Sequence, residues 1–287
     1  MSGRIDTHNH LWHFGGRDSA WINDDMQPLQ RDFLISELRA TLQQNGVDQC
    51  LLVQVLPVDR ETRWLLEIAD QNPVVAGVIG WCDITQGAAI EPTLASLQAT
   101  SSRLKGIRYM SQNLPPEHLL DPAFIAGVQA VGRAGLVYEL LLDASQLDAA
   151  RRLIEHCPDV RFVVEHCAKP RIRQQQLSPW REELAAIASS SDKVFCKVSG
   201  LVTEADWQHW RHDDLRPYIE HAFDAFGGQR VLYGSDWPVC LLAAPYAEVM
   251  GIWHRLFETG SDVQPDDFFS NNARRLYALD GAQESHP

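Results

Sequence analysis

The chain has 287 residues, 45% of them hydrophobic, and a formal net charge of −13. This length suits one large α/β domain, and the acidic balance argues against nucleic acid as a partner, because binding to its backbone needs clustered lysine and arginine. No apolar run approaches the ~20 residues of a membrane span, and no basic segment followed by an apolar one opens the chain, so we expect a cytoplasmic protein that does not insert into membranes.

The first predicted element is a short strand near the N-terminus that carries two histidines, in Ile5-Asp6-Thr7-His8-Asn9-His10. Side chains alternate along a strand, so His8 and His10 share one face and can chelate one metal ion. A zinc ion needs three or four protein ligands, so further ligands must come from elsewhere in the chain. The alternative interpretation is that both histidines are structural residues at the end of a strand.

Residues 11–31 predict a long irregular loop because glycine, asparagine, aspartate and proline recur there, and helical spacing of apolar residues follows over 32–45. From there, short apolar runs alternate with amphipathic stretches. With Arg4–His10, the apolar runs are Gln49–Val55, Val74–Trp81, Leu104–Tyr109, Leu136–Leu142, Val160–His166, Val194–Leu201 and Arg230–Tyr233. The helical stretches lie near 59–71, 87–100, 122–133, 145–156, 178–190, 205–226 and 245–258.

Buried parallel strands are apolar on both faces and therefore read as continuous apolar runs. Eight strand–helix units predict a (β/α)8 TIM barrel. The alternative is an open doubly wound sheet, but the first strand is not followed by the Gly-x-Gly-x-x-Gly that dinucleotide binding favours. No linker or low-complexity segment divides the chain. We therefore expect a single barrel domain over 1–280 and a loose tail over 281–287.

In such barrels the catalytic groups project from the C-terminal ends of the strands. His166 and Asp236 each follow an apolar run directly and precede a proline-bearing turn. Together with His8 and His10 they would form a set of three nitrogens and one oxygen, which suits zinc or manganese. Asp236 is our candidate general base, since a carboxylate beside an activated water can accept its proton. Taken singly, His166 and Asp236 are also explained as strand-end and turn residues.

Other side chains near the strand ends are candidates for substrate binding. The Arg108 guanidinium can hold a carboxylate or a polarised carbonyl oxygen, and a surface ion pair is the alternative. Lys169 and Lys197 also lie near strand ends, and the Lys197 amine either enters the pocket or pairs with a buried carboxylate such as Glu139 or Glu165. Three tryptophans are candidates for apolar pocket walls that stack on a sugar ring, with core packing as the alternative: Trp12, Trp81 and Trp237.

With these segments assembled, the chain resembles the amidohydrolase superfamily, of the amidohydrolase 2 type. The closer resemblance is to its sugar-lactonase branch, typified by L-fuconolactonase and L-rhamnonolactonase. The resemblance covers residues 5 to about 239 in the family's order. It is carried by Ile5-Asp6-Thr7-His8-Asn9-His10-Leu11-Trp12, Trp21-Ile22, Gly80-Trp81, Lys105-Gly106-Ile107-Arg108, Glu165-His166-Cys167-Ala168-Lys169-Pro170, Lys197-Val198-Ser199-Gly200-Leu201 and Tyr233-Gly234-Ser235-Asp236-Trp237-Pro238.

The resemblance implies a distorted (β/α)8 barrel that hydrolyses a lactone of an oxidised sugar. It implies a metal site of His8, His10, His166 and Asp236, with zinc as first candidate, although some relatives in this branch act without a metal. Glu165 and Cys167 depart from the branch, which usually has Asp and an apolar residue there, and both flank His166. Lys105 begins its strand, so the bridging lysine of binuclear relatives is not evident and one metal ion is expected.

Two alternatives to a lactonase remain. Part of the superfamily performs metal-dependent non-oxidative decarboxylation, for which Arg108 would grip the leaving carboxylate. The other alternative is a non-catalytic barrel that binds a partner. The expected partner of the favoured hypothesis is a small-molecule lactone, and a homo-oligomer is compatible with the sequence.

Overall fold

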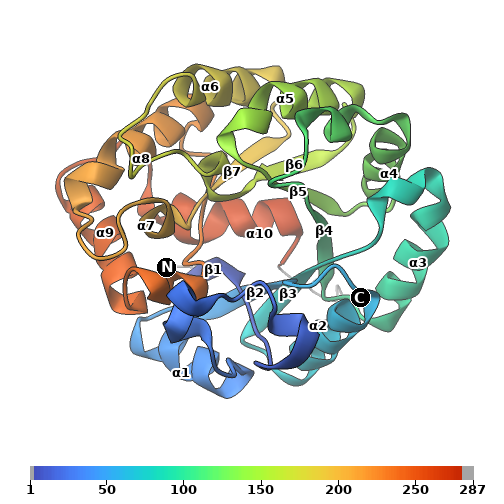
Figure 1. Ribbon diagram of the computed structural model, residues 1–287, viewed down its shortest axis with the longest axis horizontal. Helices are drawn as coiled ribbons and strands as arrows, with labels where there is room; N and C mark the ends of the chain where they lie inside the picture. The colour runs from blue at the N-terminus through green and yellow to red at the C-terminus, as the bar shows by residue number, and fades with distance from the viewer. Residues whose placement is uncertain (1–2, 280–287) are drawn as a thin grey trace, which may run out of the picture.

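The computed structural model describes residues 3–279, so the predicted tail at 281–287 lies outside the described residues. Eight parallel strands pair in chain order around a barrel (Figure 1). They are β1 (Ile5–Asn9), β2 (Gln49–Val53), β3 (Val75–Gly80), β4 (Leu104–Met110), β5 (Val137–Leu141), β6 (Arg161–Val164), β7 (Val194–Val198) and β8 (Val231–Tyr233). The Asp236 N–H donates to the His8 carbonyl (3.0 Å) and the His10 N–H to the Trp237 carbonyl (2.8 Å), which brings the first and last strands together. The predicted TIM barrel is confirmed.

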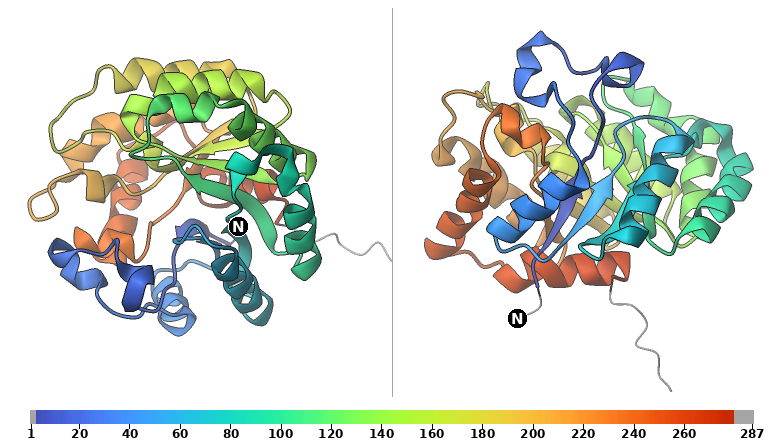
Figure 2. Two further views of the ribbon diagram at one scale, coloured as in Figure 1. Left: turned by 45° about the vertical axis from the view of Figure 1, so that its right-hand side comes forward. Right: turned by 90° about the horizontal axis from the view of Figure 1, so that it is seen from below.

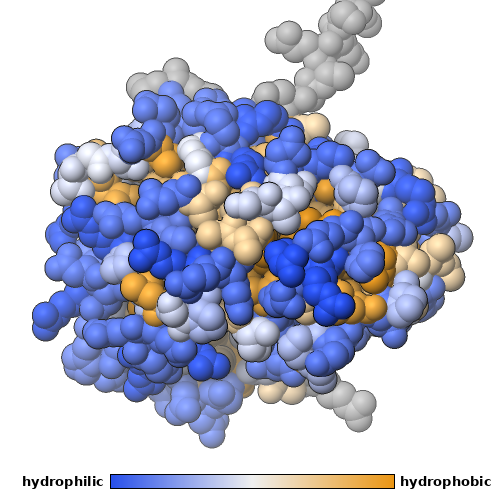
Figure 3. Space-filling view, turned by 90° about the horizontal axis from the view of Figure 1, so that it is seen from above, coloured by the Kyte–Doolittle hydropathy of each residue, from blue (hydrophilic) through white to orange (hydrophobic). Residues whose placement is uncertain are grey.

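Helices follow the strands and surround the barrel, whereas α10 (Asn272–Tyr277) crosses one end of it (Figure 1). They are α1 (Ile35–Gln44), α2 (Asp59–Gln71), α3 (Glu91–Thr100), α4 (Pro122–Arg133), α5 (Leu147–His156), α6 (Trp180–Ser190), α7 (Leu201–Glu204), α8 (His212–Phe226), α9 (Tyr246–Glu258) and α10 (Asn272–Tyr277). On the flank shown in Figure 3 their outer surface is mainly hydrophilic, with small apolar patches between. Within residues 3–279, none of the helices combines the length and the apolarity that a membrane crossing needs.

One predicted helix is wrong in its extent. The stretch 205–226 forms α8 only from His212, and the short helix α7 ends before it at Glu204. The Asp206 carboxylate accepts the backbone N–H groups of Gln208 (3.0 Å) and His209 (3.2 Å). This turn competes with helix formation, because aspartate offers the backbone an alternative hydrogen-bond partner.

Two apolar cores hold the fold together. The larger lies between the strands and the surrounding helices. The smaller fills the inside of the barrel and is closed by residues of α10, which include Ala273, Leu276 and Tyr277. Figure 2 shows α10 crossing one end of the barrel, while the loop over 11–31 lies at the opposite end. One end is therefore sealed, and a site can open only at the end where the strands point.

The loop over 11–31 is ordered by two 3₁₀ turns, η1 (Gly16–Ser19) and η2 (Asp24–Leu29). At its start, Trp12 pairs with Phe33 through backbone hydrogen bonds in both directions. The exposed Arg60 at the start of α2 contacts both carboxylate oxygens of Asp18 (2.7 and 2.6 Å). These contacts hold the loop over the open end of the barrel.

Candidate active site

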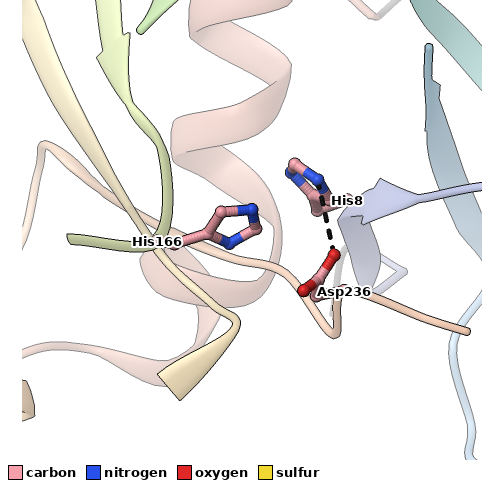
Figure 4. A group of neighbouring side chains, drawn as sticks. All are labelled: His8, His166 and Asp236. Carbon is pink, nitrogen blue, oxygen red and sulfur yellow. Dashed lines mark ion pairs between the residues drawn. The ribbon is translucent and has the colours of Figure 1, made fainter. Parts of the chain in front are cut away.

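Four predicted site residues meet at the open end of the barrel. His8 lies in β1 and His10 directly after it, His166 lies in the turn η6 (Glu165–Ala168) after β6, and Asp236 lies in the segment after β8. His8 Nε2 lies 3.1 Å from His10 Nε2, and Asp236 Oδ1 lies 3.6 Å from the former and 3.4 Å from the latter. The His8 and His166 ring centres are 4.4 Å apart. Figure 4 shows His8, His166 and Asp236 facing one another from separate strand ends.

The backbone around these residues is unusual. Four consecutive residues, from His166 to Lys169, have φ between 49° and 56°, and Asp236 has φ 60°. This left-handed region costs a non-glycine residue roughly 1–2 kcal/mol, and such strain clusters at functional sites. The turn after β6 therefore points the His166 side chain in a direction that a regular strand or helix would not allow.

Each histidine is oriented through its second ring nitrogen. His10 Nδ1 donates to the Val53 carbonyl (2.8 Å), which leaves Nε2 unprotonated in the neutral ring. His166 Nδ1 is hydrogen-bonded to Ser199 Oγ (2.9 Å). The Lys197 ammonium donates to His8 Nδ1 (3.3 Å). Because an ammonium only donates, this contact places the single ring proton of the neutral His8 on Nε2.

Asp6 is a positioning residue that the sequence analysis did not select. Its Oδ1 accepts the backbone N–H groups of His8 (3.1 Å) and Ser235 (2.9 Å), and the Tyr246 hydroxyl donates to its Oδ2 (2.8 Å). The carboxylate thus ties β1 to the segment after β8 and fixes His8 relative to Asp236. Asp6 lies two residues before His8, so both side chains are on the same face of β1, and this spacing could have identified Asp6 from the sequence.

Electrostatics favours neutral imidazoles beside an ionised carboxylate. Burial, reinforced by the Lys197 charge, holds the pKa of His8 well below its usual value. Burial also lowers the pKa of His166 to about 4. Burial alone would raise the pKa of Asp236, but the nearby imidazoles of His166 and His10 outweigh it and the pKa is lowered. At neutral pH these are the protonation states in which histidine and aspartate bind metal ions.

The donor set fits one divalent metal ion. His8, His166 and Asp236 each offer a ligand atom within 4.8 Å of the others, and all three side chains are buried. His10 adds a third imidazole beside Asp236. Three imidazoles and one carboxylate are ligands that zinc and its first-row neighbours accept. Lys105, near the start of β4, reaches instead toward the Ala278 carbonyl (3.4 Å) beside α10, at the other end of the barrel.

A buried ionic network lies next to these residues. Arg108 Nη1 contacts Glu165 Oε2 (3.0 Å), and Lys197 Nζ contacts Glu139 Oε2 (2.6 Å). Burial raises the pKa of Glu139 to about 8 even though Lys197 opposes the shift. Burial also acts to raise the pKa of Glu165, but the Arg108 charge outweighs it and the pKa is lowered. Of the two alternatives for Lys197, the structure has the paired one, beneath His8.

A cavity of about 530 Å³ opens above the site. It is lined by His10, Arg108, His166 and Asp236, and Lys169 also reaches it from the turn after β6. Its further lining residues are Asp18, Trp21, Met26, Val55, Leu56, Pro57, Met110, Gln112, Asn113, Leu141 and Val239. Polar and charged groups thus face an apolar wall, which suits a small molecule with both kinds of surface.

The three tryptophans proposed as sugar-stacking walls do not line this cavity. Trp12 and Trp237 are buried and pack edge-on against Phe33. Trp81 lines a separate cavity beside α2 and α3. Trp21, from the loop over 11–31, lines the cavity in their place. For Trp237 the structure therefore agrees with the core-packing alternative, whereas Trp12 also lines a separate cavity beside Trp64.

Comparison with known proteins assigns this chain to a family. The profile of the amidohydrolase family matches residues 5–279. The chain belongs to the amidohydrolase family. It is 34% identical to an L-fucono-1,5-lactonase of Burkholderia ambifaria, over 98% of this chain and 97% of that protein, and 34% identical to an L-fucono-1,5-lactonase of Burkholderia multivorans, over 96% of each. A crystal structure of an amidohydrolase from B. multivorans with bound zinc superposes with a TM-score of 0.89 at 34% identity, over 97% of this chain and 100% of that one.

Proposed function

We propose that this amidohydrolase opens a sugar-derived lactone to the corresponding hydroxy acid, with Asp236 as the general base. The observation that carries the proposal is the Asp236 carboxylate, which faces three imidazoles at the end of a cavity of about 530 Å³. Full-length likeness to two L-fucono-1,5-lactonases supports an aldono-lactone as the substrate class.

Asp236 is suited to accept a proton because its pKa is lowered and it stays ionised at neutral pH. It takes a proton from a water molecule as the water oxygen attacks the lactone carbonyl carbon. The bond between the carbonyl carbon and the ring oxygen then breaks. The ring oxygen leaves as a hydroxyl group after taking up the proton that Asp236 accepted from water, and the carbonyl carbon becomes a carboxylic acid.

Negative charge develops on the carbonyl oxygen during this attack. Arg108 is our candidate to offset it, because its cationic side chain lines the cavity. A donor aimed at such an oxygen is typically worth about 3–4 kcal/mol. Lys169 lines the same cavity and is therefore our candidate for binding substrate hydroxyl groups. Its ammonium also contacts the Glu204 carboxylate (3.4 Å).

We assign His8, His10, His166 and Asp236 as the residues that would hold one divalent metal ion, with zinc as the first candidate. When bound, the ion would supply Lewis acidity at this end of the cavity. Asp236 would then have two roles, as a ligand and as a base. The side-chain hydrogen bonds to His10 and His166 orient both rings for this assignment.

The test is a panel of aldono-lactones with five- and six-membered rings, including L-fucono-1,5-lactone, in which acid release and carbon dioxide release are both followed. We expect acid release without carbon dioxide, and a preference within the panel identifies the sugar. Carbon dioxide released from aromatic carboxylates would favour the decarboxylase alternative. A protein inert toward every lactone of the panel would overturn the proposal.

A further inference from the structure

Beneath the proposed metal site lies a second set of groups with metal-binding chemistry. His8, Glu139 and Glu165 each offer a ligand atom within 4.8 Å of the other two, and all three are fully buried. His8 thus faces two ways. Its Nε2 is directed to Asp236, and its Nδ1 lies 3.6 Å from Glu165 Oε1.

The Lys197 ammonium occupies this second position. Nζ lies 2.6 Å from Glu139 Oε2, 3.3 Å from His8 Nδ1 and 3.9 Å from Glu165 Oε1. The Glu165 oxygen has no hydrogen-bond partner within residues 3–279, although it is completely buried. A buried carboxylate oxygen left in this way is costly unless a cation compensates it, and Lys197 is the cation beside it.

The backbone packs closely at the base of this cluster. A Cβ atom at Gly234 would come within 2.9 Å of the His8 Cβ, 3.0 Å of the Ser199 Cβ and 3.4 Å of the Lys197 Cγ. A larger residue at position 234 would therefore displace the base of the His8 side chain. The carboxyl groups of Glu139 and Glu165 face the two cations Lys197 and Arg108, so each acidic group has a basic partner within 3.0 Å.

We propose that the Lys197 ammonium takes the place of a second divalent ion and so limits this centre to a single metal. The inference rests on the proposed metal site, and it deepens that proposal by naming the residue that sets the metal count. It follows that removal of the ammonium leaves His8 Nδ1 and the carboxyl groups of Glu139 and Glu165 without the cation that now lies among them. A divalent cation is the ligand that such a site would bind.

The test is to count zinc ions per chain, by elemental analysis after equilibration with zinc and gel filtration, in the wild type and in Lys197→Met. Methionine keeps most of the aliphatic part of the lysine side chain but has no ammonium group at the Nζ position. We expect Lys197→Met to bind one more zinc ion per chain than the wild type. The matched control is the double variant Lys197→Met/Glu139→Gln, which lacks one of the required carboxylates and should bind no extra zinc.

The thermal stability of Lys197→Met provides a second measurement, because the variant leaves two carboxylates with one fewer buried cation. A metal that replaces the ammonium should raise its melting temperature more than it raises that of the wild type, since only the variant gains a site. Lys197→Ala, which leaves more room, should behave in the same way. An equal zinc count in the wild type and both variants, or variants that stay unfolded at every zinc concentration, would overturn the inference.

Failure of the Lys197 proposal can be distinguished from failure of the lactonase proposal. If wild-type protein hydrolyses no lactone but Lys197→Met gains a zinc ion, the lactonase proposal fails while the role of Lys197 stands. If lactones are hydrolysed and the zinc count does not change, Lys197 is a structural partner of Glu139 and only the further inference is lost.

Discussion

Gly200 offers a sharp test of whether the position of His166 matters for activity. Gly200 has φ 64° at the start of α7, and a Cβ atom there would lie 2.7 Å from His166 Nδ1 and 3.3 Å from Asp236 Oδ2. The contact to Nδ1 is about 0.7 Å inside the ordinary limit of 3.4 Å. Gly200→Ala must therefore displace the imidazole by a large part of an ångström, and a misplacement of ~1 Å costs on the order of a hundredfold in rate.

The matched control is Gly135→Ala. Gly135 also has a positive φ, of 74°, but a Cβ atom there meets nothing within 4 Å. Both variants should lose roughly 1–2 kcal/mol in the free energy of unfolding, from the left-handed backbone. Only Gly200→Ala should lose lactonase kcat/KM, measured by acid release. Equal activities of the two variants, at equal stability, would refute the argument that His166 geometry governs turnover.

Three further predictions follow from individual contacts. His10→Ala should lower the zinc content measured by elemental analysis, whereas His13→Ala, at a side chain that is 66% exposed, should not. Arg108→Lys keeps the charge but loses the planar fork, and should lower kcat/KM on the order of tenfold, or about 1.4 kcal/mol. Burial raises the pKa of Glu61 from 4.5 to about 7, so the folded state binds more protons than the unfolded state between these values. The contribution of Glu61 to the free energy of unfolding should therefore fall by about 3 kcal/mol as pH rises from 4.5 to 7, and Glu61→Gln should change the pH profile by that amount in denaturant titrations; an unchanged pH profile in the variant would contradict it.

The barrel could be predicted from the sequence because each buried parallel strand is an apolar run of its own. His8, His10, His166 and Asp236 could be selected for a related reason, since each is a polar residue within or directly after such a run. The C-terminal ends of parallel strands share one end of a barrel, so sequence position alone implies that they lie near one another. The distances among them are consistent with that expectation.

The direction of individual side chains could not be predicted in the same way. The left-handed turn from His166 to Lys169 places the His166 ring against Ser199 and Gly200, which follow β7. Whether Lys197 enters the cavity or pairs below it depends on Glu139, which is 58 residues away in the chain. Contacts of this kind arise only when the strands are assembled, which is why the position of Lys197 stayed open.

The central claim is that the Asp236 carboxylate drives lactone hydrolysis at this site, and Asp236→Asn tests it most directly. The control is Asp159→Asn, at a carboxylate whose side chain is fully exposed. With the best lactone of the panel, Asp236→Asn should lower kcat by about 10²–10⁴-fold, the range that general-base catalysis spans, while Asp159→Asn keeps wild-type turnover. A folded Asp236→Asn variant that hydrolyses the lactone at the wild-type rate would contradict the account.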